Sequence, residues 1–148
     1  KWINELEEDA IFNLQSYTEC FISENLVRKL IKHKSIVLND NTDPDCAVRN
    51  RIRGYRAIET KGKKKANLSI GIRQNNDDLF YLDFKQLVHL AYLLRNNHQG
   101  GSIMDDEKAF MPIRNALMHT SRLTQDAKDR LTTVYANIKA KIRNLLSI

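Results

Sequence analysis

The chain has 148 residues, of which 42% are hydrophobic and 28% are charged. This length suits a single domain with a real core, and only five Gly and two Pro argue against a disordered or low-complexity chain. Because no apolar run approaches 18 residues, we expect no transmembrane helix, and no charged-then-apolar leader is recognisable. A first residue other than Met is compatible with a fragment or module of a longer chain.

The charge and the cysteine content indicate the kind of binding partner and the cellular compartment. The formal net charge is +6, which favours an anionic partner such as nucleic acid but is also compatible with simple solubility. Cys20 and Cys46 stand apart without a C-x-x-C spacing or a neighbouring His pair. Such isolated thiols indicate a reducing compartment, so we expect a cytoplasmic protein with no metal site and no other cofactor.

The first expected element is helical and covers residues 3–34, either as one long helix or as two pieces divided at residues 23–25. Acidic side chains in its first turns suit the positive end of a helix dipole. Apolar side chains recur at spacings of three and four, which is typical of an amphipathic helix. They are Ile3, Leu6, Ala10, Leu14, Tyr17 and Phe21.

Residues 39–66 are predicted to be the least regular part, a turn cluster followed by a basic loop. Two interpretations of the basic stretch have equal weight. It is a solvated loop, or it is a flap whose cations bind the phosphates of a nucleic acid while Tyr55 stacks on a base. The candidate RNA-binding residues are Arg49, Arg51, Arg53, Arg56, Lys63, Lys64 and Lys65.

Alternating apolar residues over 67–72, a polar turn and a returning segment over 79–82 predict a small β-hairpin. Asp83 and Gln86 then form a capping-box pattern that opens an apolar helix ending near residue 99. A further helix is expected over about 102–120, in which Pro112 either starts the ordered part or introduces a kink, and a last one is expected over 124–146. We therefore expect one all-α bundle of four to five helices with an inserted hairpin.

The stretch from Met111 to Thr120 contains the candidate catalytic side chains, an arginine, an asparagine and a histidine close together in the sequence. At about 100° per residue, Phe110, Ile113 and Leu117 form a core stripe. Asn115 and His119 lie one turn apart on the opposite side, and Arg114 falls between the two faces. A structural interpretation competes, because a histidine near a helix C-terminus also caps carbonyl groups.

Two methionines flank this polar group. Met111 and Met118 lie between the polar side and the core stripe, where exposed apolar surface indicates that something covers it. A second copy of the same helix would cover it through a two-fold axis. We therefore assign both methionines to a homodimer interface.

The run Arg114-Asn115-x-x-x-His119 resembles the signature of the HEPN family, small all-helical domains of which many are metal-independent RNases. The apolar helix before it and the Leu-Thr-x-x-Ala-x-x-x-Leu start of the last helix also resemble that family. Some members carry a tyrosine two residues past the histidine, where this chain has Ser121. The resemblance implies a HEPN-like bundle over residues 1–148 and a toxin or antiviral-defence effector, with an antitoxin or a sensor/ATPase as partner or fused domain.

Cleavage of RNA without a metal needs a base for the 2′-hydroxyl proton, a cation for the phosphorane and an acid for the 5′-oxygen. Histidine serves as acid or base, arginine holds a multiply oxygenated anion, and Asn115 orients the imidazole or a phosphate oxygen. The expected products are a 2′,3′-cyclic phosphate and a 5′-hydroxyl. Two alternatives stay open: a non-catalytic helical module for dimerisation or for binding a partner or nucleotide, and a general nucleic-acid binder that uses the basic loop.

Overall fold

In the computed structural model of the protein, the described residues are 1–36, 48–92 and 103–147, apart from the side chain of Tyr92. They form five α-helices and one 3₁₀ helix, with no strand among them. This confirms the predicted all-α class. The elements are α1 (Trp2–His33), α2 (Val48–Lys65), η1 (Asp78–Tyr81), α3 (Phe84–Tyr92), α4 (Ile103–Met118) and α5 (Gln125–Leu146).

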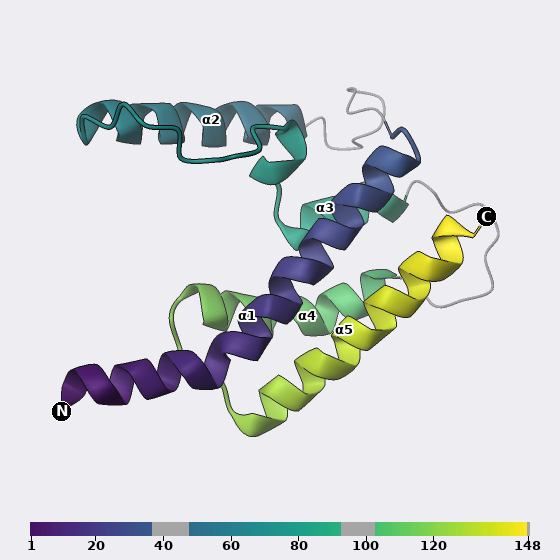
Figure 1. Cartoon of the computed structure of the whole chain (residues 1–148). Coiled ribbons are helices and arrows are strands. Elements are labelled where there is room, and N and C mark those ends of the chain that lie inside the picture. Colours follow the sequence, from purple (N-terminus) through teal and green to yellow (C-terminus); the bar gives the residue numbers. More distant parts are fainter. Residues whose placement is uncertain (37–47, 93–102, 148) are drawn as a thin grey trace.

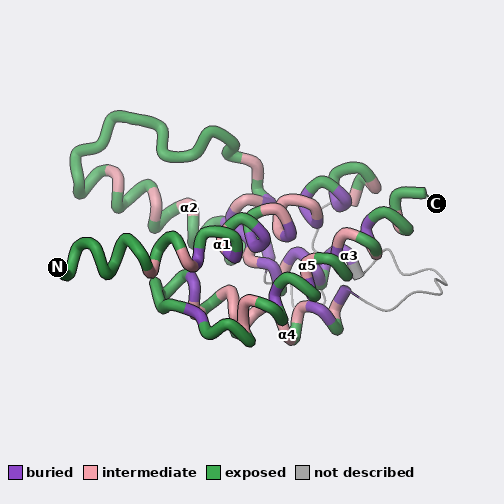
Figure 2. Tube along the Cα trace, turned by 60° about the horizontal axis from the view of Figure 1, so that its bottom comes forward, coloured by how far each residue is buried: buried purple, intermediate pink, exposed green. Residues whose placement is uncertain are grey.

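Four of the helices form the bundle (Figure 1). Helix α1 packs against α3 and α5, and α4 packs against α3 and α5, while α2 lies apart and contacts η1. The rings of Phe84 and Phe110 meet at the centre with centroids 4.1 Å apart. Figure 2 shows the buried residues gathered where these four helices meet. Fully or nearly fully buried members of this core are Val27, Leu30, Ile31, Leu87, Leu90, Leu117, Leu131 and Ile138.

Helix α1 runs without interruption, so the one-helix alternative holds. Residues 2–12 extend beyond the bundle, and Figure 2 shows this stretch as almost wholly exposed. The apolar face at spacings of three and four therefore lies outside the core. Its large members have exposed fractions between 61% and 71%; they are Ile3, Leu6, Leu14 and Phe21.

The inward side of α1 at residues 13–19 is instead polar. Asn13 donates from Nδ2 to the carbonyl of Ser121 (2.9 Å) and accepts from the backbone N–H of Leu123 (3.0 Å). Glu19 accepts from the hydroxyl of Thr132 at 2.9 and 3.1 Å. Buried polar groups are tolerated when they are hydrogen-bonded, and these bonds fix α1 against the α4–α5 connection and against α5.

The prediction of an irregular basic stretch is wrong for residues 48–65, which form α2; the turn cluster before it lies outside the described residues. Arg, Lys, Ala and Glu are good helix formers, and the lysines at its end complement the negative pole of the dipole. Val48 and Ile52, one turn apart, bury this end of the helix against the rest of the chain. A high density of charge does not oppose a helix whose side chains are solvated.

The predicted β-hairpin over 67–82 is also wrong, since the described chain has no strand there. The carbonyls of Leu79 and Leu82 accept hydrogen bonds from the Arg28 guanidinium at 3.1 and 2.9 Å, rather than from a paired strand. Asp77 caps η1 by accepting from the N–H of Leu79. The side chain of Arg56 on α2 likewise donates to the carbonyl of Asn76, so the backbone of this segment is bonded by side chains of the neighbouring helices.

The predicted starts of the last three helices are confirmed, whereas the predicted end of the first of them near residue 99 lies outside the described residues. Asp83 and Gln86 form the capping box, each side chain accepting from the other residue's backbone N–H at 2.9 Å. Thr124 caps α5 by accepting from the N–H of Ala127. Helix α4 continues through Pro112, which lies exposed inside it.

No α-helix in the described ranges has both the length and the apolar character that a membrane crossing requires.

Candidate active site

The end of helix α4 presents the predicted polar group at the surface. Phe110 and Leu117 are fully buried and Ile113 is half-buried, so the core stripe lies where the periodicity predicts it. Asn115 and His119 are exposed. Neither side chain forms a hydrogen bond or ion pair within the described part of the chain. The imidazole is therefore accessible to a ligand from outside.

The backbone after His119 turns sharply. Thr120 has a φ of 61°, its N–H donates to the carbonyl of Leu117 (2.9 Å), and the N–H of Ser121 donates to that of Ala116 (3.0 Å). These two bonds are those of a Schellman motif with His119 as the C-cap residue. A β-branched residue in the left-handed region is strained, and strain of this kind concentrates at functional sites.

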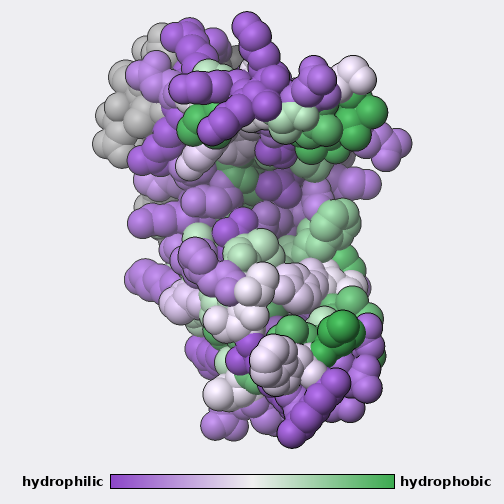
Figure 3. Space-filling view, turned by 90° about the vertical axis from the view of Figure 1, so that its left-hand side faces the viewer, coloured by the Kyte–Doolittle hydropathy of each residue, from purple (hydrophilic) through white to green (hydrophobic). Residues whose placement is uncertain are grey.

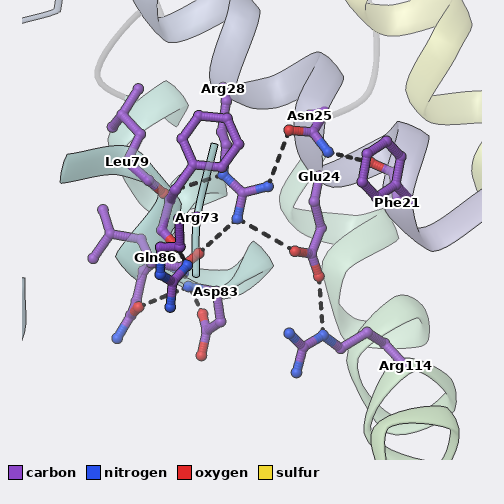
Figure 4. A network of polar contacts seen from close by, with 11 residues as sticks. Phe21, Glu24, Asn25, Arg28, Arg73, Leu79, Asp83, Gln86 and Arg114 are labelled. Atoms are coloured by element: carbon purple, nitrogen blue, oxygen red, sulfur yellow. Dashed lines mark hydrogen bonds and ion pairs between the residues drawn. The ribbon is translucent and has the colours of Figure 1, made fainter. Parts of the chain in front are cut away.

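Arg114 reaches across to α1 rather than along its own helix. Its Nε donates to Oε1 of Glu24 at 2.9 Å, and the two side chains expose 22% and 13% of their surface. Figure 4 shows the guanidinium beside this carboxylate, with its two terminal nitrogens directed away from it. The contact orients the guanidinium and leaves those Nη groups without a partner among the described residues.

Glu24 also joins Arg114 to a buried network (Figure 4). Its Oε2 accepts from Arg28 at 3.4 Å, and Arg28 in turn donates to the carbonyls of Leu79 and Leu82. Burial lowers the pKa of Arg28, although Glu24 partly opposes that effect. Through this network Arg114 is connected to the chain segment that precedes α3.

A shallow groove of about 460 Å³ opens beside Arg114. The structure brings Arg114 and Met118 together there, while Asn115 and His119 lie outside its lining and Met111 is half-buried against the core. Thus only one of the two predicted interface methionines is exposed. The groove is lined by Tyr17, Thr18, Cys20, Phe21, Glu24, Arg114 and Met118.

Cys20 forms part of that lining but is not a nucleophile. Burial raises the pKa of its thiol to about 12, and the negative charge of Glu24 adds to this shift. A thiol in this state stays protonated at neutral pH and reacts slowly.

The sequence left the acidic partner of this site open. The structure places Glu24 against Arg114 rather than against His119. A side chain 90 residues away in the sequence gives no local signal, because only the packing of α1 against α4 brings it near.

The basic residues predicted to bind RNA divide into two groups on α2. Arg49, Arg51, Arg53, Lys64 and Lys65 are exposed, while Lys63 and Arg56 are half-buried. Arg56 is engaged within the protein: it donates to Asp78 at 2.7 Å and lies 4.4 Å above the ring of Tyr81.

Among residues 1–36, 48–92 and 103–147, no group of three or more His, Cys, Asp or Glu side chains could hold a metal ion. Comparison of the chain with known protein families, with curated proteins and with solved structures found no match.

Proposed function

We propose that the protein is a metal-independent endoribonuclease of the HEPN type. One observation carries the proposal: the exposed His119 directly follows Met118, which lines a groove with the guanidinium of Arg114. His119, which can act as acid or base, and Arg114, which can bind an anion, thus lie at the same end of α4. The protein would act on RNA in the cytoplasm as a toxin or antiviral effector, under the control of an antitoxin or sensor.

In this mechanism each side chain has one task. Arg114 holds the scissile phosphate through its two Nη groups, while Glu24 keeps Nε and hence the plane of the fork fixed. His119 transfers protons, and Asn115, one turn back on the same helix side, orients the imidazole or donates to a phosphate oxygen.

The reaction is a transesterification that needs no external nucleophile. The 2′-hydroxyl attacks the adjacent phosphorus as its proton passes to a base, and the P–O5′ bond breaks as an acid protonates the leaving oxygen. The products are a 2′,3′-cyclic phosphate and a 5′-hydroxyl. One chain offers a single histidine at this place, so a second copy would supply the second proton-transfer group.

Helix α2 supports the same substrate class. Residues 48–65 hold four arginines and four lysines against one Glu, and most of these cations are exposed. A helix of this charge binds phosphates with little regard to base sequence.

A non-catalytic helical module is the second candidate function. Two contacts favour it: Arg114 is already paired with Glu24, and His119 occupies the C-cap of α4, where a histidine stabilises the helix end. In that case the same face binds a partner or a nucleotide without chemistry.

The test uses labelled RNA in excess EDTA. We expect the parent to cleave it and to leave cyclic-phosphate ends. His119→Ala should lower the rate about 10²- to 10⁴-fold and Arg114→Ala about 10²- to 10³-fold. The matched control is His89→Ala, because His89 is also an exposed helical histidine but lies on α3.

The outcomes separate the two functions. A folded His119→Ala protein that cuts as fast as the parent, or a parent that binds RNA without cutting it, excludes the enzymatic proposal and leaves the binding module. Loss of cleavage in EDTA that Mg²⁺ restores would exclude the metal-independent mechanism.

A further inference from the structure

Residues 3–21 of α1 carry a row of apolar side chains that are exposed to solvent except for the half-buried Tyr17. Its members follow one another at spacings of 3, 4, 4, 3 and 4 residues, from Ile3 to Phe21. In Figure 3, hydrophobic surface gathers over the projecting end of α1. We name this row the α1 stripe; it consists of Ile3, Leu6, Ala10, Leu14, Tyr17 and Phe21.

This stripe is a large apolar patch for the surface of a monomer. Ile3 and Phe21 each expose 71% of their surface, Leu6 66% and Leu14 61%. With the flanking Trp2, they leave on the order of 600 Å² of apolar side chain in water, at the upper end of what isolated soluble proteins show. Adding their polar neighbours brings the face near the roughly 800 Å² per partner of a standard interface.

We propose that a second copy of this chain covers the stripe, with the two α1 helices antiparallel about a two-fold axis. Apolar side chains at spacings of three and four residues are the pattern with which one helix packs against another of the same kind. A two-fold axis between residues 10 and 14 places Ile3 of each copy against Phe21 of the other. Such an interface closes on itself and leaves no stripe unpaired.

The charges of α1 select the antiparallel arrangement. Its acidic residues concentrate at the start, where Glu5, Glu7, Glu8 and Asp9 fall within five positions. Parallel helices would bring eight carboxylates together, which is unfavourable. In the antiparallel register residues 5–9 of one copy face residues 15–19 of the other, where the single acid, Glu19, is buried and bonded to Thr132.

The groove beside Arg114 supplies the other half of the fit. Tyr17, Phe21 and Met118 form its apolar part, and Met118 itself is 47% exposed. The antiparallel register directs Ile3 and Trp2 of the other copy toward this apolar end. The same contact is made twice, since each copy offers both the groove and the helix end that fills it.

The antiparallel dimer also bears on the proposed active site, and this part of the inference rests on the proposed function. Asn13 and Tyr17 hold the carbonyls of Ser121 and Leu117, so the turn that contains His119 lies beside residues 13–17 of α1. These residues are one to five positions from the axis. At about 1.5 Å per residue, the turns of the two copies lie roughly 3–15 Å apart along the helix direction. The dimer thereby brings the second histidine that the mechanism needs to the vicinity of the first.

The decisive experiment measures oligomeric state without RNA. By sedimentation equilibrium we expect a dimer for the parent, and at least a tenfold higher dissociation constant for Leu14→Glu. Ile58→Glu is the matched control, because Ile58 is a similarly exposed aliphatic residue, at 70%, on α2. Both substituted positions are exposed, so circular dichroism and the melting temperature of the monomers should be unchanged. A parent that stays monomeric at hundred-micromolar concentration, or a Leu14→Glu variant as dimeric as Ile58→Glu, overturns the proposal.

Disulfide cross-linking tests the direction of the helices in a Cys46→Ser background. An antiparallel pair predicts that Ala10→Cys and Leu14→Cys proteins cross-link when mixed and that neither does so efficiently alone. Strong self-cross-linking of Leu14→Cys overturns the antiparallel arrangement.

Failure here is distinct from failure of the proposed function. A parent that dimerises but cuts no RNA supports the interface and overturns the enzymatic proposal. A monomeric Leu14→Glu protein that cuts RNA at the parent rate overturns the link between the dimer and the site.

Discussion

At the scale of one residue, the buried Arg28 connects α1 to the chain segment before α3. Only 8% of its surface is exposed, and its guanidinium donates to the carbonyls of Leu79 and Leu82 while lying 4.8 Å above the ring of Phe80. One side chain from α1 thus fixes both η1 and the start of α3. It also holds Glu24, which in turn orients Arg114.

Replacing Arg28 by Ala should therefore destabilise the fold. The carbonyl of Leu82 loses its side-chain donor, and the Leu79 carbonyl and the Glu24 carboxylate each lose one of two donors in a buried setting, so we expect a loss of about 2–4 kcal/mol. Urea unfolding followed by circular dichroism measures this free energy. Arg53→Ala is the control, since that arginine is exposed on α2 and its removal should change stability by less than about 0.5 kcal/mol. Equal effects of the two substitutions would contradict this role for Arg28.

Asp77 gives the fold a dependence on acid pH. Partial burial raises the pKa of this carboxyl, but hydrogen bonds from Lys32 and from the N–H of Leu79 outweigh that effect and lower the pKa below its ordinary value of 3.8. A lowered pKa in the folded state adds stability above the ordinary pKa, and this stability is lost as the pH falls through the folded value. The parent should have a higher free energy of unfolding than Asp77→Asn at pH 6, and this difference should shrink as the pH falls into the strongly acid range. A difference that stays constant over this range would show that Asp77 does not contribute through its charge.

At the scale of elements, three described helices end in the same way. Ser35, Asn67 and Thr120 have φ values of 53°, 55° and 61°, and each begins a turn closed by paired backbone bonds to the preceding helix. Asparagine tolerates this conformation, whereas a β-branched threonine does so poorly. The strained end is the one that carries His119.

Thr120→Gly should relieve that strain. We expect a gain of up to about 1 kcal/mol in the free energy of unfolding, because glycine adopts a positive φ without a steric cost although it adds entropy to the unfolded chain. Ser35→Gly serves as the comparison, since serine is not β-branched and its gain should be smaller. Thermal unfolding of both variants measures the difference. Destabilisation by Thr120→Gly would mean that the hydroxyl, which donates to the carbonyl of His119 at 2.7 Å, matters more than the backbone.

The whole molecule is an apolar bundle with two projecting helices of opposite charge. The first half of α1 is acidic at its start, while α2 carries most of the excess positive charge. In Figure 1 both project on the same side of the bundle. If α2 contacts RNA, the affinity must fall with salt in proportion to the number of phosphates that it neutralises.

This can be tested with two arginines that lie one turn apart on α2. Arg53 has no ion pair within the described residues, whereas Arg56 is paired with Asp78. Arg53→Ala should weaken RNA binding and reduce the slope of log K against log salt by about 1. Arg56→Ala should change the slope less, because its charge is already compensated. Titrations of labelled RNA at several salt concentrations give both slopes, and equal slopes for both variants and the parent would remove α2 from the RNA-binding surface.

Local patterns alone determined much of this architecture. The capping box at Asp83, the Thr124 cap and the apolar spacing of α5 each operate within one helical turn, so they are legible in the sequence, as are the exposure of His119 and the burial of Phe110 and Leu117. The HEPN resemblance and the RNase activity remain proposals. Tertiary structure decided what depends on distant partners. It placed Glu24 against Arg114, gave the carbonyls near η1 to Arg28 instead of a strand, and left the apolar side of α1 in solvent while burying the polar one. Periodicity shows that a helix has an apolar face, but which face is buried depends on the free energy of all contacts together, including bonds such as those of Asn13 to residues more than 100 positions away.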